Sequence, residues 1–190
     1  RPARGITNAM MARLQPMEHA WPAYPVQNAL MACAAFVGVA LALFLFEGLI
    51  PLPFLAPGAK LGLANLITLI AIYTLPRWQD TLLVISVRII LATMFGGGPT
   101  ILLYSLSGGL LSFVVMLLLR RCRCFSLLGI SAAGGFAHNL GQLLVASLVI
   151  DNPGLLLYLP LLGPCGLLTG LLLGICAKLA LKKLSSNRFL

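Results

Sequence analysis

The chain has 190 residues, of which 60% are apolar and only 9% are charged, and its mean hydropathy is +1.02. A soluble domain carries about 25% charged residues, so this chain cannot cover a globular surface with solvated groups and is predicted to be an integral membrane protein. A net charge of +9 would point to nucleic acid in a soluble protein. In a membrane protein the basic residues first set the topology, and we expect no nucleic acid partner.

The chain begins with residues 1–27, which contain four prolines and are predicted to form a flexible cytoplasmic tail. The apolar runs after it are predicted to cross the lipid bilayer, because a bilayer core of about 30 Å needs about 20 helical residues. These runs are Asn28–Glu47, Lys60–Leu75, Thr81–Phe95, Thr100–Leu119, Ser126–Ile150 and Gly154–Leu181. The sequence therefore predicts an all-α integral membrane protein with six transmembrane helices over residues 28–184 and a short cytoplasmic tail over 185–190.

Lysine and arginine are distributed unequally between the two sides of these predicted spans. Eleven of the thirteen basic residues fall in the two tails and in the second and fourth connections, whereas the opposite side holds only Lys60. Because cytoplasmic loops are enriched in lysine and arginine, both termini are predicted to be cytoplasmic. The remaining basic residue, Arg88, lies inside the third predicted span.

The first predicted span carries small residues at four-residue spacing, namely Ala34, Gly38 and Ala42. Small residues at this spacing let helix backbones approach closely in lipid. Two interpretations stay open: packing within this chain, or a docking surface for another membrane protein.

The first external connection is apolar and rich in proline. Its stiff and turn-forming residues are Pro51, Pro53, Pro57 and Gly58. Proline removes backbone donors and stiffens the chain, and glycine permits a sharp turn, so we expect this connection to act as a gate over the mouth of the bundle. Lys60 follows it and is predicted either to face a ligand or to extend to the membrane surface. Asn65 lies about one and a half helical turns deeper.

Polar side chains at membrane depth are the main functional signal. Arg88 lies near the middle of its span, where an arginine costs about 2.5 to 3.5 kcal/mol on insertion scales and needs a partner or a water-filled cavity. Glu47 is the acidic residue placed to be its intramembrane partner. The fifth predicted span adds His138, Asn139 and Gln142. Helical spacing places Ser131, Gly135, His138 and Gln142 on one stripe, which is predicted to line a cavity.

Together these residues predict a binding site for a small molecule. Arginine can hold a carboxylate or a phosphate through two parallel hydrogen bonds, so the expected ligand is anionic or zwitterionic. The predicted contacts are Glu47, Lys60, Asn65, Arg88, His138, Asn139 and Gln142. The alternative is a membrane scaffold without a ligand, in which Arg88 is paired with backbone carbonyls or with Glu47.

Neither the cysteines nor the acidic residues predict a metal site. The five cysteines are an odd number with no paired framework, which argues against disulfides. The four acidic residues are far apart, which excludes the acid-dense motifs that hold magnesium or calcium in soluble enzymes. His138 has no second histidine or cysteine on its helix face to form a zinc site. We therefore expect no metal, no cofactor and no catalytic residue.

Three runs carry a resemblance to a known family: "FEGLIPLPFLAPGAKLGLANLITLIAIYTL", "LYSLSGGLLSFVVM" and "GGFAHNLGQLLVASLV". They resemble the membrane protein family called heptaprenyl diphosphate synthase component I, also called the Gx transporter family. The resemblance extends from about Asn28 to Leu184 and is most specific in "PGAKLGLAN" and "AHNLGQ". That family is similar in size and six-helix organisation to the substrate-binding S components of energy-coupling factor vitamin transporters.

The similarity to S components implies a transport function. In those proteins the first external loop closes over a ligand bound between helices, and small residues on the first helix contact the coupling subunit. We expect a substrate-binding or transport subunit of the bacterial plasma membrane for an anionic or amphiphilic molecule of the vitamin or isoprenoid precursor class. Since the chain has no "GxxxxGK[ST]" motif, ATP-driven movement would require a partner membrane subunit with ATPases.

The family name implies a different function. A prenyl diphosphate synthase holds magnesium with paired aspartate-rich motifs, whereas this chain has only Asp80 and Asp151, which are predicted to lie on opposite sides of the membrane. The chain alone cannot build that active site. The alternative function is a non-catalytic membrane accessory subunit of heptaprenyl diphosphate synthesis, partnered with a soluble polyprenyl synthase.

Overall fold

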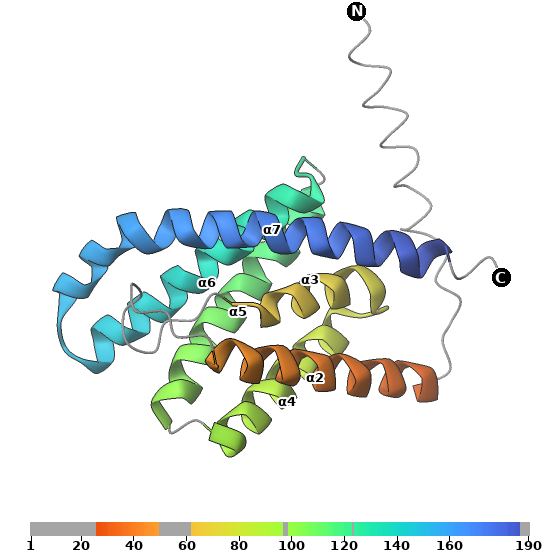
Figure 1. Ribbon diagram of the computed structural model, residues 1–190, viewed down its shortest axis with the longest axis horizontal. Helices are drawn as coiled ribbons and strands as arrows, with labels where there is room; N and C mark the ends of the chain where they lie inside the picture. The colour runs from red at the N-terminus through yellow and green to blue at the C-terminus, as the bar shows by residue number, and fades with distance from the viewer. Residues whose placement is uncertain (1–25, 50–61, 97–98, 123, 187–190) are drawn as a thin grey trace, which may run out of the picture.

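A computed structural model describes residues 26–49, 62–96, 99–122 and 124–186. These residues form six α-helices, one short 3-10 helix and no strand, which confirms the predicted all-α class (Figure 1). The helices are α2 (Val26–Gly48), α3 (Ala64–Thr74), α4 (Trp78–Gly96), α5 (Pro99–Cys122), α6 (Leu127–Val149), the 3-10 helix η2 (Pro153–Tyr158) and α7 (Leu159–Ser186). Most of the predicted tail over residues 1–27 and the predicted gate residues Pro51, Pro53, Pro57 and Gly58 lie outside the described residues.

Four of the described helical segments are long and apolar enough to cross a membrane. They are Asn28–Gly48, Trp78–Phe95, Leu102–Cys122 and Pro153–Leu184. Helix α6 has 23 residues, but its imidazole and amide side chains lower its hydropathy. Helix α3 has only 11 residues, about 16 Å of helix, and is shorter than the bilayer core. The fold therefore fits a multi-pass membrane protein, while the six-span topology and the cytoplasmic termini stay predictions.

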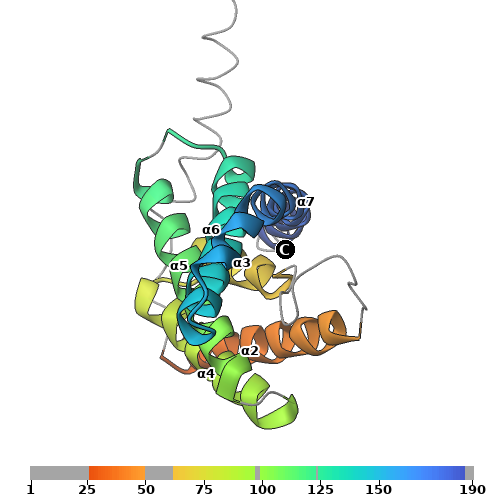
Figure 2. The ribbon, with the colours of Figure 1, turned by 90° about the vertical axis from the view of Figure 1, so that its left-hand side faces the viewer.

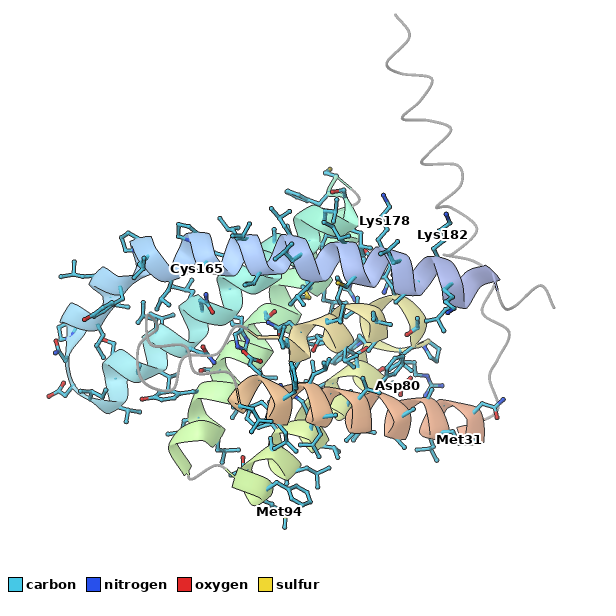
Figure 3. The ribbon with its side chains drawn as sticks, in the orientation of Figure 1. Met31, Asp80, Met94, Cys165, Lys178 and Lys182 are labelled. Carbon is cyan, nitrogen blue, oxygen red and sulfur yellow. The ribbon has the colours of Figure 1, made fainter. Side chains whose placement is uncertain are left out.

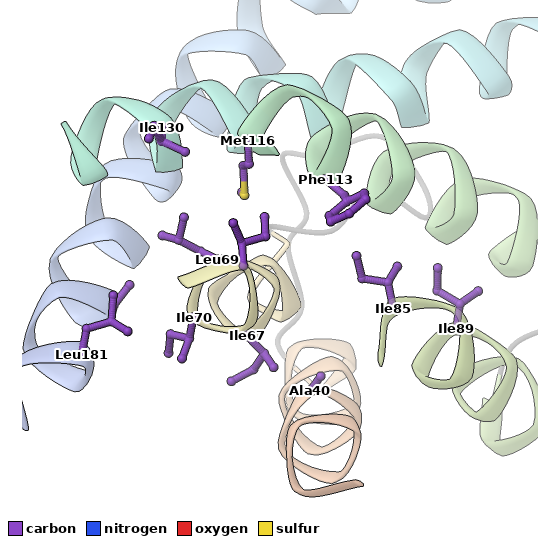
Figure 4. Packing of buried hydrophobic residues seen from close by; sticks show 12 residues of the cluster. Ala40, Ile67, Leu69, Ile70, Ile85, Ile89, Phe113, Met116, Ile130 and Leu181 are labelled. Atoms are coloured by element: carbon purple, nitrogen blue, oxygen red, sulfur yellow. The ribbon is translucent and has the colours of Figure 1, made fainter. Parts of the chain in front are cut away.

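The short helix α3 lies at the centre of the bundle. Eight of its 11 residues are buried, and Figure 2 shows it between α2 and α7. Its side chains Ile67, Leu69 and Ile70 meet apolar side chains from all the other α-helices in one core cluster (Figure 4). A helix buried on all sides does not need to reach both membrane surfaces, which accounts for its length.

The C-terminal end of α3 is held by an arginine from α5. Arg120 donates a hydrogen bond to the carbonyl of Ile72, and its guanidinium lies 4.8 Å from the centre of the Tyr73 ring. A cation is favourable at this end of a helix, where the backbone carbonyls have no helical partners.

We expect Arg120→Met to lower the free energy of unfolding by about 1 to 3 kcal/mol, because it removes a charge-assisted hydrogen bond and a cation–π contact. Arg121→Met is the matched control, since Arg121 is exposed at the next position of α5. Thermal unfolding in detergent checks the difference, and equal midpoints for the two variants would contradict the role given to Arg120.

Helix α6 packs against α5 and α7 through close backbone contacts at glycines. A Cβ on Gly141 would lie 2.7 Å from the carbonyl oxygen of Ser107 in α5, and a Cβ on Gly170 would lie 2.5 Å from that of Ser131 in α6. A Cβ on Gly135 would overlap the carbonyl oxygen of Gly166 in α7. The predicted stripe on α6 is therefore divided, because Ser131 and Gly135 pack against α7 rather than line a cavity.

Helices α2, α4 and α7 bring four labelled residues to one end of the bundle. Met31, Asp80, Lys178 and Lys182, from α2, α4 and α7, lie toward the same end of the molecule (Figure 3). The thiol of Cys33 lies 4.0 Å from the carbonyl oxygen of Asp80, which places the second turn of α2 beside the first turn of α4. The predicted placement of lysine and arginine on the cytoplasmic side of the membrane stays a prediction.

Candidate functional site

Five of the predicted site residues come together from four helices. Glu47 lies at the end of α2, Asn65 in α3, Arg88 in α4, and His138 and Gln142 in α6. They are only 3%, 3%, 4%, 5% and 8% exposed, in that order. Helix α5 lies between α4 and α6, and its glycines are next to the side chains of the site. The predicted contact Lys60 lies outside the described residues.

Gly62 is the residue at which the start of α3 packs closely against α6. Its backbone has a φ of 81°, in the left-handed region that favours glycine. A Cβ at this position would lie 2.9 Å from Nδ2 of Asn65 and 3.1 Å from Cδ2 of His138. The lack of a side chain therefore lets both polar groups approach the backbone at the start of α3.

Two adjacent glycines of α5 lie between the side chains of His138 and Arg88. A Cβ on Gly108 would lie 2.9 Å from Nδ1 of His138 and from Cγ of Gln142. A Cβ on Gly109 would lie 3.5 Å from a terminal guanidinium nitrogen of Arg88. Because Gly108 and Gly109 are consecutive, the side chains from α4 and α6 lie on neighbouring faces of one turn of α5.

Arg88 also contacts α2, through the ring of Phe44. Its guanidinium carbon lies 5.8 Å from the centre of the Phe44 ring, one helical turn before Glu47. The opposite charges of Arg88 and Glu47 attract each other. No hydrogen bond joins the Arg88 guanidinium to another of the described residues.

Glu47 makes contacts that the sequence did not predict. Its two carboxylate oxygens accept hydrogen bonds from the backbone N–H groups of Gly62, at 2.7 Å, and of Leu63, at 3.0 Å. Leu63 precedes α3 and provides no side-chain cap of its own. The carboxylate therefore caps the positive end of α3 from another helix and holds the end of α2 close to the start of α3.

Several polar atoms in this region are buried and have no hydrogen-bond partner among the described residues. At the site these atoms are Nδ2 of Asn65, Nδ1 of His138 and Oε1 of Gln142. Thr81 and Ser112 each carry a further unpaired hydroxyl. Buried polar groups are nearly always paired in proteins, so the unpaired groups around Gly62 and Gly108 make this cluster the candidate functional site.

Asn139 lies apart from this cluster. Its amide nitrogen donates a 2.7 Å hydrogen bond to the carbonyl of Leu162 in α7. A buried amide with a protein partner of this kind joins α6 to α7, so we leave Asn139 out of the proposed ligand contacts.

The small residues of α2 face outward. Ala34, Gly38 and Ala42 are exposed, and a Cβ on Gly38 would meet no atom within 4 Å. Packing within the described part of the chain therefore does not explain their spacing.

The site residues that the sequence did not predict are Phe44, Gly62, Gly108 and Gly109. The pair "GG" at 108–109 inside an apolar run was an available signal, since consecutive glycines weaken a helix unless another group approaches closely. Phe44 gave no signal, because one aromatic residue among many in an apolar span is ordinary. Within the described residues no group of three or more His, Cys, Asp or Glu side chains is placed to hold a metal ion.

The fold and the site define a helical membrane protein with a buried cluster of polar residues between its helices. A family model described as heptaprenyl diphosphate synthase component I matches residues 36–180, and the chain belongs to this family. The match extends from α2 into α7 and includes every described residue of the cluster. No curated protein and no solved structure matches the chain.

Proposed function

We propose that this protein is a membrane-embedded binding subunit for an anionic small molecule, organised like the S components of energy-coupling factor transporters. The observation that carries the proposal is Arg88, a buried guanidinium that donates no hydrogen bond within the described residues and lies beside unpaired polar atoms of three other residues. A buried cation without hydrogen bonds is costly. A carboxylate or phosphate bound there would accept the hydrogen bonds that Arg88 donates to none of the described residues.

The test is retention of a small molecule by protein purified from its native membrane in mild detergent. We expect mass spectrometry to detect an anion at about one molecule per protein with the wild type, and a loss of at least about tenfold with Arg88→Gln. Arg121→Gln is the control, since it removes one exposed charge at the end of α5 and should retain the anion. Equal retention by Arg88→Gln, or no anion in the wild type, would refute the proposal.

Membership of the family favours a second function, that of a membrane accessory subunit of heptaprenyl diphosphate synthesis. This function predicts that a soluble polyprenyl synthase copurifies with the protein and that deletion changes the chain length of the polyprenyl product. A coupling subunit with ATPases in the same purification, together with a retained anion, would instead favour transport. The exposed small-residue face of α2, Ala34, Gly38 and Ala42, is the surface that we propose for such a membrane partner.

A further inference from the structure

The unpaired polar atoms of the site gather on one side of α5, separate from the arginine. His138 and Gln142 approach Gly108, and His138 and Asn65 approach Gly62. Arg88 approaches Gly109 on the neighbouring face. The site therefore has two parts: a cationic part at Arg88, and an uncharged part, which we call the amide part, formed by Asn65, His138 and Gln142.

The amide part determines which hydrogen-bonding groups a bound molecule must have. The amide nitrogen of Asn65 is a donor that needs an acceptor, and the amide oxygen of Gln142 is an acceptor that needs a donor. Nδ1 of His138 lies against the backbone of Gly108 and adds a third polar position. A hydrocarbon group placed there would leave the two amide atoms without a partner and without water, which is strongly unfavourable for buried polar groups.

We infer that the bound molecule has two different ends, an inference that rests on the proposed function. One end is an anion held by Arg88. The other end is an uncharged group that both donates and accepts hydrogen bonds, such as an amide, a lactam or an amino heterocycle, and it binds Asn65, His138 and Gln142. An anion with only an isoprenoid or fatty chain satisfies the first part of the site and not the second.

Two matched probes test this inference by thermal stabilisation of the purified protein. Adipamate and 6-methylheptanoate carry the same carboxylate and the same four-methylene chain, and they differ in a terminal amide against an isopropyl group of similar shape. We expect adipamate to raise the unfolding temperature at a concentration about tenfold lower than 6-methylheptanoate does. Gln142→Met should remove this preference.

The same variant has a second readout that separates a binding role from a structural one. Replacing an unpaired buried amide by an apolar side chain of similar shape relieves an unsatisfied group, so Gln142→Met should raise the unfolding temperature of the probe-free protein. Asn139→Leu is the control, since Asn139 has a partner in Leu162 and its loss should lower that temperature.

Each outcome of these experiments supports or overturns the inference. Equal stabilisation by the two probes, or a Gln142→Met variant that is less stable and keeps the preference, overturns the inference and leaves the proposed function standing. If neither probe stabilises the protein but the wild type retains an anion, the identity of that anion decides: hydrocarbon groups alone overturn the inference, and an amide or amino heterocycle supports it. No response to either probe together with no retained anion overturns both.

Discussion

Gly135→Ala should lower the free energy of unfolding by about 3 kcal/mol or more, because it forces α6 and α7 apart. The new methyl group would overlap the carbonyl oxygen of Gly166, and a backbone atom held in a helix cannot move aside as a flexible side chain can. Overpacking of a core costs about 1 to 3 kcal/mol in ordinary cases, and overlap with backbone belongs to the upper end. Thermal unfolding in detergent should show a fall of about 10 °C in the midpoint.

Gly38→Ala is the matched control for this substitution. Gly38 also lies within a membrane helix, but a Cβ there would meet nothing within 4 Å. Alanine has the higher helix propensity, so this variant should be as stable as the wild type or slightly more stable. If the two variants lost similar stability, any glycine-to-alanine change in a helix of this protein would be destabilising. The close approach of α6 to α7 would then not explain the effect of Gly135→Ala.

Hydrophobic run length and charge boundaries were sufficient to place the long helices. Helix α2 ends next to Glu47 and α5 ends among the arginines after Leu119, close to the predicted bounds. Helix α3 is shorter than its predicted run, since the structure describes it only as Ala64–Thr74. The hydropathy of a segment does not distinguish a helix that crosses lipid from one that is enclosed by other helices.

The candidate site was predictable in its residue types but not in its pairings. Buried polar residues such as Arg88 and His138 stand out in an apolar sequence because their burial is costly. The pairings were not predictable, because a sequence does not show which backbone groups lie nearby. Asn139 and Gln142 look alike in sequence, yet only the first has a protein partner. The four-residue spacing of Gly166, Gly170 and Gly174 was a signal for helix packing that the sequence analysis did not use.

Glu47→Ala should be the most destabilising substitution within the site, with an expected loss of about 3 to 5 kcal/mol. It removes two hydrogen bonds to an ionised acceptor, leaves the N–H groups of Gly62 and Leu63 without that acceptor, and takes away the negative charge that attracts Arg88. Glu47→Gln should cost less, because one oxygen still accepts a backbone N–H. Asp151→Asn is the control, since Asp151 is exposed after α6 and asparagine also tolerates its φ of 51°.

A double-mutant cycle separates the two roles of Glu47. If the carboxylate only caps α3, the losses from Glu47→Gln and Arg88→Met should add, because capping does not involve the arginine. If it also balances the charge of Arg88, the double variant should be more stable than the sum predicts, since removing both charges leaves no buried charge uncompensated. We expect the second result, because the carboxylate both accepts the two backbone N–H groups and attracts Arg88. Strict additivity within about 0.5 kcal/mol would restrict Glu47 to the helix cap and leave the charge of Arg88 to be compensated by the bound anion.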